Sequence, residues 1–442
     1  MTAPDTLARP PGADAAPAVV SPSAAPRRPG VAARAVAALS STPGHLRTAL
    51  AVALVGAVVV GLLGFQAGRA QDAALDAART GSERLVLLQD VRTDLVTADA
   101  TATNAFLVGG LEPVDQREEY DARVASAARN LARLAQTGDA GDVAVLGSVG
   151  AQITRYTGLV EQARANNRQG FPVGSAYLGT ASTVMSEEIL PPLTDLVAAE
   201  SGRVDARFDA TGTALRLVAA CLLGLVLLLG VQVWLARRTH RVLNTGLVTA
   251  TAVVLVAGIV GTALLASVRG TADDVRAGPY TTATSVAAAE TQANVARSGA
   301  GLGLIQRGSG ADVEPEVQSA LDSARDHLAD AGTEAAGRLT DDLDAWADAH
   351  AAVRELDDAG RWDDAVAAAT DASDDPTSST ATFATFMADA DTAVSSNAGQ
   401  VGDELLSAGT RAEVAAWLLL AAGAVAALAS WRGVHRRLEE YR

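Results

Sequence analysis

The sequence predicts an all-α membrane protein with four transmembrane helices and two extracytoplasmic four-helix bundles in tandem repeat. Two observations predict this fold class. Four runs of apolar residues carry no charge, and each is long enough for a helix to cross a hydrocarbon core of about 30 Å. Only four of the 51 acidic residues lie outside segments 69–216 and 269–413, whereas 12 of the 35 arginines do. The positive-inside rule predicts this division if both acidic segments lie outside the cytoplasm.

The N-terminal part is predicted to be a disordered cytoplasmic tail, residues 1–46, followed by the first transmembrane helix, residues 47–69. The tail is rich in proline and alanine and shows no apolar periodicity. A cleaved signal peptide is the alternative for the apolar run Thr48–Gly68. The run is longer than an h-region of about 7–15 residues and begins far from the N-terminus, which favours an uncleaved anchor. Gly64 and Gly68 form a small-xxx-small pair, a helix-packing signal.

Residues 70–216 are predicted to form bundle 1. From Gln71 to Val108, apolar or small residues recur at steps of three and four, which indicates one helix with a buried stripe. The charged residues of this stretch fall mostly between those positions and are expected to face water. Further helices are expected at about 113–136, 143–167 and 175–216. The last is interrupted at Pro191 and Pro192 and then continues into the membrane, giving up-down-up-down connectivity.

The centre of the chain is predicted to be a transmembrane hairpin. Its apolar runs, Leu217–Ala236 and Val242–Val268, flank a short basic link. The remaining boundaries are transmembrane helix 2 at 217–236, the cytoplasmic link at 237–245, transmembrane helix 3 at 246–268, bundle 2 at 269–412, transmembrane helix 4 at 413–431 and a cytoplasmic tail at 432–442. Residues 104–110 align with residues 302–308 at the same turn of each bundle. This correspondence predicts a tandem repeat.

Reaction chemistry leaves no mark on the sequence. The zinc-protease, nucleophile-elbow, Walker and dinucleotide-binding motifs are missing, so we expect no enzyme, no cofactor and no metal site. His327 and His350 are expected on solvated helix faces. The acids from Asp341 to Asp348 suggest calcium, but they lack the glycine and register of an EF-hand loop, which favours a solvated face. Transport is disfavoured because the four apolar runs contain no ionisable side chain.

Composition limits the partners further. A net charge of −16 argues against nucleic acid. Cys221 is the only cysteine, so one chain forms neither a disulfide nor a thiolate metal site.

Two sets of residues are candidates for binding. In the bundles these are the scarce aromatics and two arginines near the matched loops, which suit an acidic ligand or partner: Tyr120, Tyr156, Arg168, Phe171, Tyr177, Trp346, Arg361 and Trp362. Core packing for the aromatics, and solvation for the arginines, are the alternatives. At the cytoplasmic side a docking face is composed of Arg237, Arg238, Arg241, Arg436 and Arg437. Topological anchoring by the positive-inside rule explains these arginines fully and is the favoured interpretation.

An extracytoplasmic four-helix bundle between two membrane helices resembles the sensor half of methyl-accepting chemotaxis receptors. No coiled-coil signalling domain follows, however. With two such units in tandem and arginine as the only basic residue besides histidine, residues 47–442 resemble the GlnX-type membrane proteins of actinobacteria. That resemblance implies a non-enzymatic relay between a periplasmic glutamate/aspartate-binding lipoprotein and a cytoplasmic Ser/Thr kinase. A directly liganded sensor and a structural envelope protein are the alternatives. Besides membrane lipid and these partners, homo-oligomerisation stays open.

Overall fold

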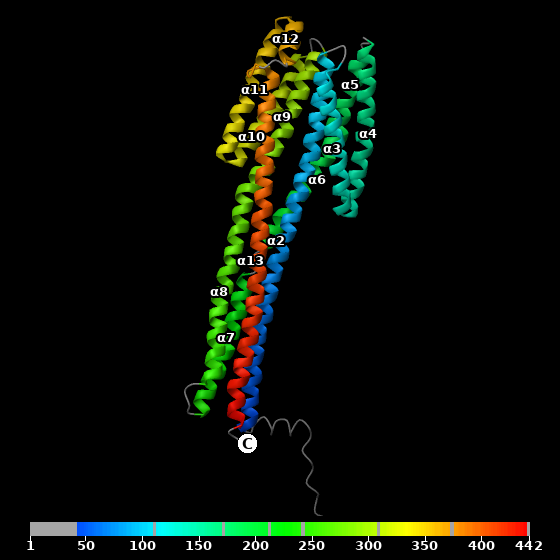
Figure 1. The fold of residues 1–442 in the computed structure, drawn as a ribbon. Coiled ribbons are helices and arrows are strands. Elements are labelled where there is room, and N and C mark those ends of the chain that lie inside the picture. The colour runs from blue at the N-terminus through cyan, green and yellow to red at the C-terminus, as the bar shows by residue number, and fades with distance from the viewer. Residues whose placement is uncertain are drawn as a thin grey trace, which may run out of the picture.

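The computed structural model describes residues 42–108, 112–169, 173–210, 214–239, 244–306, 310–371 and 375–439. Every regular element within these ranges is a helix, and the predicted all-α fold is confirmed (Figure 1). In chain order the elements are α2 (Thr42–Val108), α3 (Val114–Thr137), α4 (Ala140–Arg168), α5 (Val173–Thr183), η1 (Val184–Ile189), α6 (Leu190–Asp209), α7 (Ala214–Thr239), α8 (Thr245–Val275), η2 (Arg276–Tyr280), α9 (Thr281–Ile305), α10 (Gly310–Ala331), α11 (Glu334–Asp358), α12 (Trp362–Ala369) and α13 (Ser379–Glu439). The predicted tail, residues 1–46, lies mostly outside the described residues.

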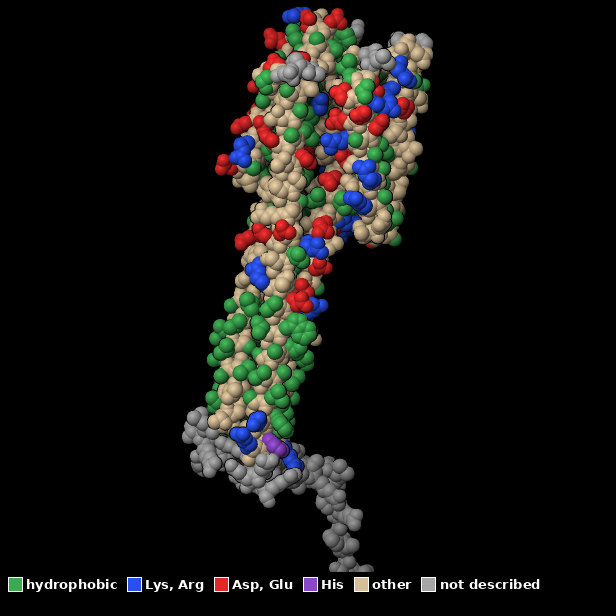
Figure 2. Space-filling model, in the orientation of Figure 1, with side chains coloured by type: hydrophobic (Ala, Val, Ile, Leu, Met, Phe, Trp, Pro, Cys, Tyr) green, Lys and Arg blue, Asp and Glu red, His purple; other side chains and the backbone are tan. Residues whose placement is uncertain are grey.

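Four of the described helices, α2, α7, α8 and α13, contain segments long and apolar enough to cross a membrane. They pack together at one end of the molecule, where hydrophobic side chains dominate the surface, while charged side chains cover the other end (Figure 2). Leu222, Ile259 and Leu428 are 57%, 63% and 64% exposed there. Large apolar side chains that point outward on four neighbouring helices suit contact with lipid.

Long helices connect the membrane end to the bundles. Helix α2 has 67 residues, about 100 Å at 1.5 Å per residue, and α13 has 61. Helices α8, η2 and α9 follow one another without a gap. Between α6 and α7 the chain passes through residues 211–213, so the predicted continuity of the fourth bundle helix with the membrane lies outside the described residues.

Prolines change the helices differently from what the sequence suggested. Pro191 and Pro192 do not interrupt the fourth helix, because they occupy the first turn of α6, where a missing N–H costs little. The adjustment lies just before them in η1, which is a π-helical segment. A second π-helical segment, η2, contains Pro279. In both places the wider turn accommodates the proline and the helical path continues.

Each bundle has its own apolar core. Bundle 1 consists of the membrane-distal half of α2 with α3, α4 and the α5–η1–α6 helix, around core residues such as Tyr156 and Leu178. Bundle 2 consists of α9, α10, α11 and the first part of α13, around Trp346, Phe383 and Phe386. The two bundles stand side by side at the membrane-distal end (Figure 1).

Buried charges hold the base of bundle 1 together. The Glu200 side chain on α6 is 2% exposed and lies 2.6 Å from Arg203, 3.2 Å from Arg207 and 3.5 Å from Arg84 of α2. A buried carboxylate is tolerated where several cations and hydrogen bonds replace its hydration. Glu200 therefore ties α6 to α2.

The expectation that the charged residues of α2 face water is wrong for its distal half. Asp94 and Asp99 are 6% and 4% exposed. Asp94 lies against α3, where Arg123 donates to it at 3.3 Å, whereas Asp99 lies where α9 of bundle 2 packs on α2. The two helices pair residues about one repeat apart: the hydroxyls of Thr93 and Thr291, 198 positions apart in sequence, lie 3.5 Å from each other, and the Ser298 hydroxyl donates at 2.5 Å to Asp99, which lies 199 positions before it. Since this offset matches the predicted alignment of the repeats, α2 and α9 meet through equivalent positions, as two subunits meet across a two-fold axis.

In the membrane, glycines let α2 and α13 approach closely. A Cβ atom added to Gly68 would lie 2.7 Å from the Cβ atom of Ala416, and one added to Gly64 would lie 2.8 Å from that of Leu419. Gly423 of α13 similarly meets Gly61. The packing face predicted from Gly64 and Gly68 is confirmed, and its partner is the last membrane helix.

Candidate ligand site in the first bundle

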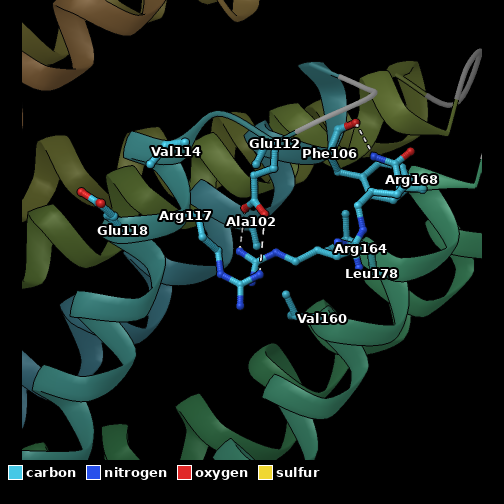
Figure 3. A pocket seen from close by; sticks show the side chains of 13 residues that line it. Ala102, Phe106, Glu112, Val114, Arg117, Glu118, Val160, Arg164, Arg168 and Leu178 are labelled. Atoms are coloured by element: carbon cyan, nitrogen blue, oxygen red, sulfur yellow. Dashed lines mark hydrogen bonds and ion pairs between the residues drawn. The ribbon is translucent and has the colours of Figure 1, made fainter.

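A cavity of about 390 Å³ opens at the membrane-distal end of bundle 1, between α2, α3, α4 and α5 (Figure 3). Its apolar lining includes Ala102 and Ala105 from α2, Val160 and Ala163 from α4, and Leu178 from α5. Alanines on facing helices leave space that larger side chains would fill. The volume is in the range of small-molecule sites, about 300–1,000 Å³.

Arg164 crosses one side of this cavity and is fully engaged. Its guanidinium donates at 2.8 Å to Glu112 and at 2.8 Å to Glu161, and it lies 4.1 Å from the centre of the Tyr120 ring. Figure 3 shows Glu112, Arg117 and Arg164 pointing toward one another. Arg117 also lies 3.1 Å from Glu161. Two carboxylates therefore compensate these two arginines.

Arg168 is different. It lies at the C-terminal end of α4, lines the cavity, is exposed and forms no ion pair with the described residues. A guanidinium presents donors in a planar fork that matches a carboxylate or phosphate. The cavity thus combines an apolar interior with one cation, Arg168, that has no ion pair among the described residues; Glu118 on α3 is an acid of the lining that likewise has none there.

Asp99 lies below the cavity, in the core between the bundles. Both of its carboxylate oxygens accept from Ser182 of α5, at 3.1 and 3.2 Å, and one accepts from Ser298 of α9. Burial raises the pKa of Asp99, while the hydrogen bonds from Ser298 and Ser182 act in the opposite direction. The Tyr156 ring is fully buried nearby, and burial together with the Asp99 charge raises the pKa of its hydroxyl. One carboxyl group thereby connects α2 with both bundles.

The structure brings together only part of the predicted binding set. Arg168 lines the cavity, Tyr120 lies under Arg164, and Tyr156 packs 6.5 Å from Tyr120 in the core beneath. Tyr177 is half-buried against the bundle 1 core. Phe171 lies outside the described residues.

The other predicted residues of the bundles lie in bundle 2. Trp346 is 1% exposed and packs with His350 and Phe383, so it is a core residue. Arg361 donates to Asp364 at 2.7 Å, and Trp362 donates to the carbonyl oxygen of Leu304 at 2.8 Å. These contacts explain the three side chains through packing and local hydrogen bonding.

The predicted docking face is only partly described. Arg237 is exposed near the end of α7, and Arg436 lines a groove of about 330 Å³ between α8 and α13. The side chains of Arg238, Arg241 and Arg437 lie outside the described residues. Its role as a docking face stays a prediction.

Bundle 2 repeats the polar wall of the cavity but fills its interior. Tyr156 and Arg164 are eight residues apart on α4, as Trp346 and Arg354 are on α11, and Arg354 lies 3.5 Å from Glu314 near the start of α10. His350 occupies the turn that Val160 occupies on α4. It is 4% exposed, which makes its predicted position on a solvated face wrong, and it lies 3.1 Å from Glu314. Beside His350 and Trp346 a space of about 40 Å³ remains, to whose lining α2, α9 and α11 contribute.

Of the residues that line the cavity only Arg168 was predicted, and the polar wall formed by Glu112, Arg117 and Arg164 escaped the sequence prediction. A signal for one of them existed, because Arg164 follows Tyr156 by two helical turns and so shares its face of the helix. The partnership with Glu112 had no such signal, since that residue lies beyond the end of α2 and meets α4 only in the folded bundle.

The region that contains the cavity also has a known counterpart. Residues 74–209 match the family model of the actinobacterial sensor domain. This sensor domain coincides with bundle 1 and contains every residue that lines the cavity. No curated protein and no solved structure matches the chain. The match supports a sensing or signalling role for a multi-pass membrane protein of actinobacterial type.

Proposed function

We propose that the protein is a non-enzymatic transmembrane signal relay in which the sensor domain receives an extracytoplasmic signal and α2 carries it to the membrane. One observation supports this proposal above all: α2 runs without a break from the membrane end to the wall of the cavity, where Ala102, Ala105 and Phe106 line the space. A ligand or partner that binds two positions of α2 unequally shifts their populations at both ends of the helix.

The partners follow from the resemblance to GlnX-type proteins. In this proposal a periplasmic lipoprotein that binds glutamate or aspartate docks on the bundles, and a cytoplasmic Ser/Thr kinase reads the basic end. The division of acidic and basic residues supports this orientation. Crosslinking in intact membranes, followed by purification of the full chain and mass spectrometry, tests the partners. Retention of both is expected; a preparation that retains neither refutes this form of the relay.

Direct binding of a small anion is the second candidate, favoured by Arg168 at the cavity, which forms no ion pair with the described residues. The full chain in detergent is titrated with a panel of small carboxylates and inorganic phosphate while its melting temperature is followed. A rise that disappears in Arg168→Ala supports direct binding. Arg338→Ala is the matched control, because Arg338 is exposed on α11 and pairs only with Glu334 among the described residues. A flat response of the wild-type chain to the whole panel removes this candidate.

A further inference from the structure

Polar side chains fill the seam where α2, α9 and α13 meet between the bundles. Glu290 of α9 is 5% exposed. Asp90 of α2 is half-buried and Asp391 of α13 is exposed, and both lie close enough for their charges to act on Glu290. Three carboxyl groups thus converge from three helices that lead to the membrane, directly for α2 and α13 and through η2 and α8 for α9.

The seam contains fewer hydrogen-bond donors than its buried acceptors require. Oε1 of Glu290 is buried and accepts no hydrogen bond. One turn further along α9, Asn294 is fully buried; its amide nitrogen donates to the carbonyl oxygen of Glu290 and faces the Met387 sulfur, while its Oδ1 has no donor. Gln89 of α2 likewise donates to the carbonyl oxygen of Thr284 and leaves Oε1 unpaired. A buried acceptor without a donor costs about 1–3 kcal/mol.

A proton on Glu290 changes this balance, because a protonated carboxyl group has an O–H donor and an ionised one has only acceptors. The charges of neighbouring residues also favour the protonated form of Glu290. The groups that face Glu290 are Asp391 from α13, Asp90 from α2 and Arg123 from α3, and Arg123 lies 3.3 Å from Asp94. Among the described residues, α10 and α11 add no charge that acts on it. Burial, reinforced by Asp391 and Asp90, raises the pKa of Glu290 to about 8.

We propose that Glu290 is a proton-binding site through which the pH around the bundles controls the packing of α2, α9 and α13. When the carboxylic acid releases its proton to water, a negative charge remains in the buried seam beside Asp90 and Asp391. The seam loosens, and the three helices transmit the change toward the membrane. This function does not depend on the cavity in bundle 1 or on any ligand there, so failure of one proposal leaves the other standing.

Hydrogen–deuterium exchange of the full chain in lipid nanodiscs tests the proposal. Protection of segment 281–305 is measured at about pH 6 and about pH 9 and corrected for the intrinsic exchange rate. We expect protection in the wild-type chain to fall about tenfold or more at the higher pH. Glu290→Gln, which keeps the shape and cannot ionise, is expected to hold its protection at both pH values. Glu334→Gln, at an exposed site of bundle 2, is expected to behave as the wild-type chain does.

Two outcomes overturn the proposal: an unchanged protection in the wild-type chain, or an equal loss in Glu290→Gln. Asp391→Asn provides an independent check if the first variant does not fold, because Asp391 is exposed. Removing this neighbouring charge lowers the pKa of Glu290, so the midpoint of the loss of protection is expected to move to lower pH. A midpoint that stays in place, or rises, contradicts the proposal.

Discussion

The glycine seam between α2 and α13 leads to a quantitative prediction for Gly68→Ala. The added Cβ atom would lie 2.7 Å from the Cβ atom of Ala416 and 2.8 Å from the carbonyl oxygen of Ala412. Carbon atoms pack best at about 3.5–4.0 Å, so the helices must separate by roughly 1 Å. Overpacking of this kind costs about 1–3 kcal/mol, and the better helix propensity of alanine returns up to about 1 kcal/mol. We therefore expect a net loss of about 1–2 kcal/mol.

Unfolding of the full chain in mixed micelles measures this loss. Trp417 of α13 reports on the seam by fluorescence, since its ring lies 5.1 Å from that of Phe65 on α2. Gly230→Ala is the matched control: Gly230 lies in the membrane part of α7, is exposed, and has nothing within 4 Å of an added Cβ atom. If the two alanine variants differ by less than about 0.5 kcal/mol, close packing of α2 on α13 does not stabilise the protein as argued.

Four further predictions concern the bundles. Glu200→Ala leaves three arginines without their shared partner and should cost about 3 kcal/mol in the free energy of unfolding, whereas Glu188→Ala, which breaks an exposed pair, should cost less than about 1 kcal/mol; equal losses would contradict the structure. Asp99→Ala leaves the Ser182 and Ser298 hydroxyls unpaired and should lower the stability by about 2 kcal/mol in a denaturant titration. Val160→His, which copies bundle 2, should abolish any ligand-induced rise in melting temperature without lowering the basal value by more than a few degrees. The native state holds the Glu290 proton up to about pH 8 and the unfolded state only to about its ordinary pKa of 4.5, so stability should fall between these values as pH rises, by up to about 1.4 kcal/mol per pH unit relative to Glu290→Gln.

The membrane helices and the bundle helices were predictable because their signals are local. An uncharged apolar run and a stripe at helical spacing depend on nearby residues only, so α2, α8 and α13 follow from the sequence. The burial of Asp99 was not predictable in this way. Periodicity identifies one buried face of a helix, and the opposite face of α2 is covered by α9, which lies nearly 200 residues further along the chain.

The cavity could not be predicted from the sequence for a similar reason. Its volume depends on which side chains four helices present to one another, and no single helix reveals that sum. Val160 and His350 show the difference: each occupies the same turn of its own bundle, yet one leaves a cavity and the other fills it through a contact with Glu314. Because histidine is polar, the sequence suggested a solvated face for His350. In the structure its contact with Glu314 on α10 makes burial possible.

In the proposed relay, the repeat explains why only one bundle needs to receive the signal. Because α2 and α9 meet through equivalent positions, the chain contains within itself the arrangement that a symmetric dimer would have. Fusion of the two units removes the requirement that both stay identical. Bundle 1 retains the open cavity and the match to a sensor domain, while bundle 2 has a filled core and contributes Glu290 and Ser298 to the seam. In the proposed relay, bundle 2 then acts as the surface against which α2 moves, and the seam between the bundles sets how readily it moves.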